Sequence, residues 1–184
     1  HIELAAPVVH IWYLRGTRSW LAYLLAGIEP KEELKAKQLE KVIYFAAHLV
    51  TWVDGDKRHD DLSSLEAEYL GELEAIEKER DIEIEKRFKD LEKDAERLEK
   101  EGAKDAEVKA MQKVADKEIS SIRDRYVGEI DLLKRTWDEF RSLHSRQIIE
   151  DEVLWRELRD RYSDYFEGGT GADAIKSLID RIDF

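Results

Sequence analysis

Apolar residues recur at helical spacing along the central part of the chain. Over residues 62–98, and again over residues 108–140, apolar positions lie about 3.6 residues apart, the period of an amphipathic α-helix. Gly102 lies in the short polar turn between them, so the sequence predicts an antiparallel helical hairpin in which each stripe buries the other. The first stripe comprises Leu62, Leu65, Tyr69, Leu73, Ile76, Ile84, Phe88, Leu91, Ala95 and Leu98, with Arg80 at a skipped position, and the second comprises Val108, Met111, Ala115, Ile119, Ile122, Tyr126, Ile130, Leu133, Trp137 and Phe140.

The residues before the hairpin follow shorter and less regular patterns. β-branched and aromatic residues on both sides of a proline predict two short strands within residues 1–14. Residues 17–27 carry one apolar helical face and end on a glycine, and a second helix is expected over Pro30–Lys41. The continuous apolar run 42–53 predicts a helix that gives way to a strand near Ala47.

Polar residues and glycines mark the remaining boundaries. The polar run 54–61 predicts a break before the hairpin, and Ser63, with a glutamate three residues later, predicts a capping box at the start of the first arm. After the hairpin, residues 150–166 predict another amphipathic helix. Residues 167–182 predict a glycine-rich break and a last helix, capped by Thr170 and the aspartate three residues after it.

Together these elements predict a mainly α chain built on a small α+β base. Because the two arms have nearly equal length, the chain is expected to return near its point of departure. Residues 1–53 and 146–184 would then form one discontinuous base of short strands and helices. Residues 54–145 would form an inserted antiparallel coiled coil that protrudes from it.

Composition restricts the classes of function. The net charge of −12 and the pI near 5.0 argue against a free-standing nucleic-acid binder, because phosphate neutralisation requires a basic surface. The chain has no cysteine, which excludes a disulfide framework and thiolate metal sites. Without an apolar run of membrane-spanning length or a basic signal-peptide start, it is expected to be cytoplasmic and to bind no membrane.

No residue pattern predicts catalysis, a cofactor or a metal site. Alternating aspartates within residues 54–60 resemble the start of a calcium loop, but arginine, histidine and leucine occupy its later ligand and turn positions. The glycines at 168–171 lack the Lys-Ser/Thr pair of a phosphate-binding loop. The acids of the first arm predict a solvated face, with an acidic surface for a basic partner as the alternative.

Two sets of residues are candidate contact sites. Arg15 and Arg18, beside Trp20, form a small basic and aromatic group that could contact a nucleic-acid backbone. Gly102 and Lys104 mark the predicted tip of the hairpin, where a partner protein could bind.

Several segments of the chain resemble the β′ subunit of bacterial RNA polymerase, in the same order. "HIELAAPVVHIWYLRG" is similar to the segment that follows the zinc-binding element of that family, and "KVIYFAAHLV", "RELRDRYSDYF" and "GADAIKSLI" are similar to later stretches. "LSSLEAE", "LEKEGAK" and "IRDR" resemble the helical insertion of actinobacterial β′ subunits. Residues 26–38 are a few residues longer than the usual linker of the family.

The resemblance implies a non-catalytic segment of the polymerase clamp, with a lineage-specific coiled coil. The expected partners are the rest of β′, the β, α and ω subunits, σ or other transcription factors, and DNA through the whole enzyme. The zinc and catalytic magnesium of the family would be bound outside this chain, which is expected to hold no cofactor, and the location would be the nucleoid. The alternative from another class is an autonomous coiled-coil scaffold; a small stand-alone enzyme is the weakest reading.

Overall fold

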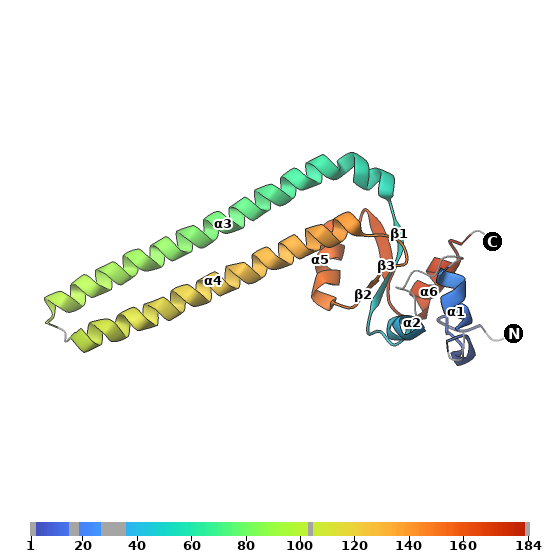
Figure 1. Ribbon diagram of the computed structural model, residues 1–184, viewed down its shortest axis with the longest axis horizontal. Coiled ribbons are helices and arrows are strands. Elements are labelled where there is room, and N and C mark those ends of the chain that lie inside the picture. The colour runs from blue at the N-terminus through green and yellow to red at the C-terminus, as the bar shows by residue number, and fades with distance from the viewer. Residues whose placement is uncertain (1–2, 15–18, 27–35, 103–104, 183–184) are drawn as a thin grey trace. The chain divides into compact units, whose positions relative to one another are not determined.

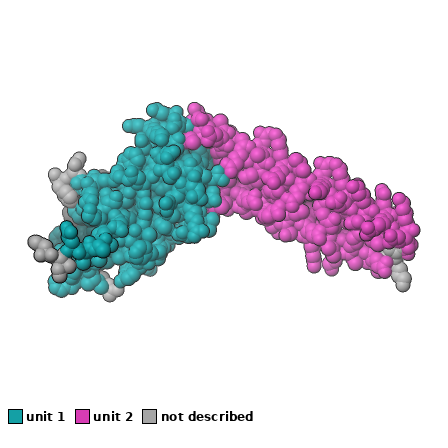
Figure 2. Space-filling model, turned by 180° about the vertical axis from the view of Figure 1, so that it is seen from behind, with its two compact units in different colours: residues 1–61, 136–184 teal, residues 62–135 magenta. Residues whose placement is uncertain are grey.

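The computed structural model describes residues 3–14, 19–26, 36–102 and 105–182. It divides the chain into two compact units, coloured separately in Figure 2. The first, called the base, comprises residues 1–61 and 136–184, and the second, called the hairpin, comprises residues 62–135. The described residues are mainly helical, as the sequence predicts.

A small antiparallel sheet organises the described part of the base. Strand β1 (His48–Val53) lies at the centre, between β2 (Ile148–Ile149) and β3 (Phe166–Gly169). The pairing of β1 with β3 is irregular between Val50 and Trp52. The sheet therefore joins segments that lie far apart in the sequence, on both sides of the hairpin.

Three helices form one part of the core together with residues of β1 (Figure 1). They are α1 (Trp20–Ala26), α2 (Ala36–Ile43) and α6 (Gly171–Ile179). Their buried apolar side chains meet Leu49 of β1, which is fully buried. The buried members of this cluster are Leu21, Leu25, Leu39, Val42, Ala47, Leu49, Ala174, Ile175 and Leu178.

Aromatic rings, with buried aliphatic side chains such as Leu143 and Leu158, form a second part of the core of the base. Helix α5 (Glu152–Tyr162) begins at Asp151, whose carboxylate accepts hydrogen bonds from two backbone N–H groups of the first turn. Tyr162 at the end of α5 stacks on Phe140, with ring centroids 3.9 Å apart. Residues 136–142, the last turns of α4, therefore belong to the base.

The hairpin consists of residues 62–100 of α3 (Gly55–Lys100) and residues 105–135 of α4 (Asp105–Ser142), which run antiparallel and side by side (Figure 1). The α4 stripe is buried at Ala115, Ile119 and Tyr126. All of α3 is described, and none of its residues is fully buried. The coiled-coil hairpin predicted by the two stripes is present, with the α4 stripe more deeply buried than the α3 stripe.

Charged side chains fix the register of the two arms along one side. Glu83 accepts hydrogen bonds from the Tyr126 hydroxyl at 2.7 Å and from Arg125 at 2.5 Å, and Arg87 pairs with Glu118 at 2.6 Å. The hydroxyl of Tyr126, followed by Arg125, holds the pKa of Glu83 below its ordinary value. The contacts of Glu83 therefore add stability above its unfolded pKa of about 4.3, and this stability is lost as the pH falls through the lower folded-state value.

The two strands predicted within residues 1–14 are wrong. Residues 3–14, the described part of this range, contain no strand, and a single 3₁₀ turn, η1, spans Ile11–Tyr13. β-propensity reflects packing on a half-buried sheet surface, and in the structure η1 has no buried residue. The predicted change from helix to strand near Ala47 is confirmed, because α2 ends at Ile43 and β1 begins at His48.

The predicted break at 54–61 is also wrong, because α3 already begins at Gly55. The Asp54 carboxylate accepts a hydrogen bond from the backbone N–H of Lys57 at 3.0 Å, so Asp54 starts the helix. Ser63 therefore lies inside α3 and caps nothing. The starting residue Pro30 and the glycine that would end the first helix lie outside the described residues.

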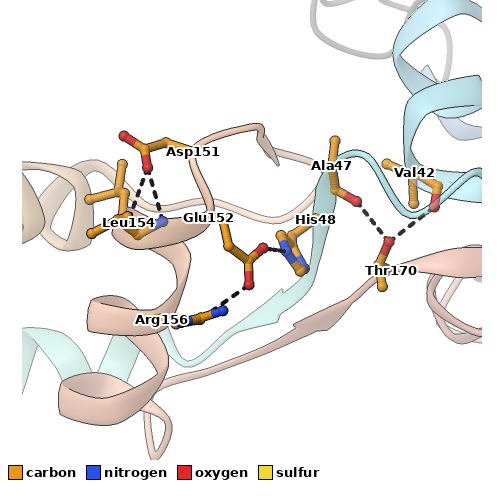
Figure 3. A network of polar contacts seen from close by, with 9 residues as sticks. Val42, Ala47, His48, Asp151, Glu152, Leu154, Arg156 and Thr170 are labelled. Carbon is orange, nitrogen blue, oxygen red and sulfur yellow. Dashed lines mark hydrogen bonds and ion pairs between the residues drawn. The ribbon is translucent and has the colours of Figure 1, made fainter.

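Thr170 precedes α6 as predicted, but its side chain makes no capping hydrogen bond. Its hydroxyl instead lies 3.1 Å from the carbonyl oxygen of Val42 and 2.9 Å from that of Ala47 (Figure 3). The hydroxyl thus ties the start of α6 to the turn between α2 and β1. The predicted domain boundaries, between residues 53 and 54 and between residues 145 and 146, remain predictions. The two compact units described above are divided at other positions.

Candidate interaction surface

Large apolar side chains are exposed along the first part of the base. Trp12 is 79% and Trp20 69% exposed. Exposed apolar side chains that gather at one place often mark a binding surface, and Val8, Tyr13 and Leu24 of this set line one hollow. The exposed large apolar residues between 3 and 24 are Leu4, Val8, Ile11, Trp12, Tyr13, Trp20 and Leu24, and we call them the apolar face.

Local hydrogen bonds hold part of this face in a defined conformation. The Nδ1 atom of His10 accepts a hydrogen bond from the backbone N–H of Trp12 at 3.2 Å, which caps η1. The His10 ring also meets the rings of Trp12 and Tyr13 edge to face. The hydroxyl of Ser19 donates to the carbonyl of Tyr13 and accepts from the N–H of Ala22. The aromatic side chains are therefore exposed on an ordered backbone.

An apolar hollow of about 440 Å³ adjoins these residues. It lies between the segment 7–13, helix α1 and helix α6, so three separate parts of the base contribute to it. A hollow of this size can accept side chains from another protein. Its apolar lining comprises Pro7, Val8, Val9, Tyr13, Leu21, Leu24, Ala172, Ile175 and Ile179.

A second exposed aromatic pair follows α2. Tyr44 is 66% and Phe45 is 74% exposed, and Phe45 has a positive φ of 61°. This conformation is costly for a bulky side chain and is found where the surrounding structure enforces it. A Cβ atom on Gly171, which itself has a φ of 76°, would lie 2.9 Å from the Phe45 ring. The absence of a side chain at Gly171 therefore leaves room for Phe45.

A polar network connects β1 with α5 (Figure 3). The Nε2 atom of His48 lies 2.7 Å from Glu152, and the His48 ring stacks on Trp155. Arg156 also reaches Glu152. The hydrogen bond from His48 is the main reason that the pKa of the Glu152 carboxyl is lowered. The network is a structural tie between two elements.

The described residues were compared with the arrangement that a metal site requires. Across those residues, no group of three or more histidines, aspartates and glutamates is placed to hold a metal ion. None of the helices described is both long and apolar enough to cross a membrane. That this chain holds no cofactor remains a prediction.

The contact residues predicted from sequence are only partly visible. Arg15, Arg18 and Lys104 lie outside the described residues. Gly102 has a φ of 73°, a conformation that glycine adopts at little cost at the end of a helix, and an added Cβ would meet nothing within 4 Å. Trp20, next to the predicted basic pair, belongs to the apolar face.

The sequence pattern predicted strands for the residues of the apolar face between 4 and 13, whereas Trp20 and Leu24 were expected on the helix 17–27. The same composition, β-branched and aromatic, fits a buried strand and a protein-binding surface equally well. The proline and the histidine at positions 7 and 10 are the signals that would have favoured an irregular, capped segment.

Comparison with known proteins gives a consistent set of relatives. The chain is 49% identical, over 183 residues, to the DNA-directed RNA polymerase subunit beta' of Salinispora tropica and to that of Corynebacterium urealyticum. It is 50% identical to that of Corynebacterium jeikeium. Each match covers the whole of this chain but only 13–14% of the relative. No protein-family model matches the chain.

Proposed function

Since the chain belongs to the family of the bacterial RNA polymerase β′ subunit and corresponds to one segment of it, we propose that it is a non-catalytic interaction segment of the polymerase. In this role the base docks onto the rest of β′ through its apolar face. The hairpin is an added structural or partner-binding element. Among the described residues no group of acids is placed to hold a metal ion, so the nucleotidyl-transfer chemistry is assigned to other parts of β′.

The apolar face is the observation that supports this proposal. Among the described residues between 3 and 24, seven large apolar side chains are exposed, and hydrogen bonds hold part of their backbone. Burial of each such side chain is worth about 1.5–3 kcal/mol, so the face can supply a substantial part of a stable interface. An autonomous scaffold would have no reason to expose it, and the match along the whole chain disfavours that alternative.

The whole subunit then gives this segment its context. We propose that it takes part in synthesis of RNA from nucleoside triphosphates on a DNA template, together with the β, α and ω subunits. Its place in the cell would be that of the polymerase, on the nucleoid in the cytoplasm. Contacts with σ, with other transcription factors and with DNA are assigned to the assembled enzyme.

Assembly of the polymerase tests the proposal. The segment is placed in the β′ subunit of one of the relatives, with Trp12→Ser and Trp20→Ser together, and core enzyme is reconstituted. Loss of two large apolar anchors is expected to reduce the yield of assembled enzyme about tenfold or more. The measurement is the fraction of β′ that co-elutes with β and α on size exclusion.

The matched control is Ile82→Ser with Val114→Ser, which removes two comparably exposed apolar side chains from the hairpin. This variant is expected to assemble normally. The melting temperature of each isolated chain shows whether folding is intact, and both are expected to be close to wild type because the side chains are exposed. Normal assembly of the Trp12/Trp20 variant would contradict the proposal.

A further inference from the structure

One side of the hairpin has an apolar hollow that none of the contacts described above uses. It lies between α3 and α4, has a volume of about 540 Å³, and is lined at its centre by Ile84, Phe88 and Val127. Phe88 is 43% and Val127 60% exposed. The sequence predicted Phe88 as part of the buried stripe, but Phe88 is exposed, whereas the neighbouring Arg87 is half-buried and pairs with Glu118.

The hollow and the polar contacts involve different sides of α3. Ile84 follows Glu83, and Phe88 follows Arg87, so each apolar residue lies about 100° further around α3 than its polar neighbour. The pairs made by Glu83 and Arg87 join the arms along one edge. Along the hollow, apolar side chains of both arms are exposed to solvent. An amphipathic helix of another protein commonly binds by placing its apolar face in such a groove.

Charge distinguishes what this hollow can accept. Arg80 pairs with Asp81 at 2.9 Å, and Glu85 pairs with Lys89 at 2.6 Å, so three of the four charged residues in the lining are compensated. The fourth, Arg123, forms no ion pair with the other charged residues of the lining. The local charge left to be matched is therefore a single positive one beside an apolar surface, although the chain as a whole carries −12.

We propose that this hollow is a docking site for an amphipathic helix of a partner protein that presents a carboxylate next to its apolar residues. The apolar side of that helix covers Phe88 and Val127, and its carboxylate pairs with Arg123. A guanidinium matches a carboxylate with two parallel hydrogen bonds, which supplies orientation as well as attraction. The site is separate from the apolar face, and it does not depend on the function proposed for the base.

The test uses the 184-residue chain and two designed helical peptides. Both carry the same leucine stripe, with glutamates beside the stripe in one and lysines in the other. At about 0.15 M salt, where the Debye length is about 8 Å and the long-range field of the acidic chain is screened, the acidic peptide is expected to bind about tenfold more tightly. Fluorescence anisotropy measures both dissociation constants.

Variants locate the binding. Arg123→Glu is expected to weaken the acidic peptide about tenfold or more and to reverse the preference, while Phe88→Ala weakens both peptides about fivefold. Ile82→Ala, a more exposed apolar residue of the same helix outside the lining, is expected to change neither constant. Circular dichroism confirms that each variant is folded.

Three results would overturn the proposal: equal binding of the two peptides, tighter binding of the basic one, or binding that is insensitive to Arg123→Glu. The same chain is titrated with duplex DNA and single-stranded RNA. Nucleic-acid binding that is lost with Arg123→Glu would likewise assign the site to another class of ligand.

Discussion

Replacing Phe140 by alanine is expected to lower the free energy of unfolding of the base by about 3–5 kcal/mol, the usual cost of removing a buried aromatic ring. Phe140 has no exposed surface, and its ring stacks on that of Tyr162. The ring centroids of Trp137 and Tyr165 lie 6.0 Å and 5.5 Å from the centroid of the Phe140 ring. The guanidinium of Arg58 lies over the ring and donates hydrogen bonds to the carbonyl oxygens of Phe140 and Leu143. The substitution therefore opens a cavity where α4, α5 and the first turn of α3 meet.

Urea unfolding followed by tryptophan fluorescence measures this effect, because Trp137 lies beside the cavity. Phe88→Ala is the matched control, since Phe88 is 43% exposed and its loss is expected to cost only about 1 kcal/mol. If the two variants have equal free energies of unfolding, the packing of Phe140 against its aromatic neighbours does not stabilise the base as expected.

Gly168→Ala is expected to destabilise the base by about 3 kcal/mol. A Cβ at this position would lie 2.6 Å from the carbonyl oxygen of Leu49 and 2.7 Å from the Trp155 ring. The first neighbour is backbone of the central strand and cannot move without breaking the pairing of Val50 with Gly168. β3 must then shift, and the stacking of Trp155 on His48 shifts with it.

The neighbouring glycine provides the comparison. At Gly169 an added Cβ would meet only the methyl group of Ala174, at 3.9 Å, which is ordinary contact. Gly169→Ala is therefore expected to change the melting temperature by no more than a few degrees, against about 10 °C or more for Gly168→Ala. Equal melting temperatures for the two variants would show that β3 does not approach β1 this closely.

The long helices could be predicted from the sequence because their apolar stripes repeat many times. A stripe of ten positions tolerates one exception, and the misplacement of Phe88 did not disturb the prediction of α3. The start of α3 was missed because the polar run after Asp54 carries no apolar periodicity, although the aspartate itself is a good helix cap. Boundaries depend on such single residues.

The sheet could be predicted only at its central strand. β1 is a continuous apolar run, whereas β2 has two residues and β3 has the sequence Phe-Glu-Gly-Gly, neither of which carries a strand pattern. Both strands form because β1 offers free backbone groups on each edge, which is a tertiary effect. The apolar face could not be assigned from composition, because exposed and buried aromatic residues look alike in a sequence.

Solvent exposure of the apolar face, compared between the isolated chain and the assembled enzyme, tests whether this face is an interface. Hydroxyl-radical footprinting is applied to Trp12 and Trp20 in the isolated chain and in a core enzyme whose β′ carries this segment. Docking through the face is expected to give heavy oxidation of Trp12 and Trp20 in the isolated chain and about tenfold protection in the enzyme, with Phe88 of the hairpin labelled alike in both. Equal oxidation of Trp12 and Trp20 in the two samples would contradict it.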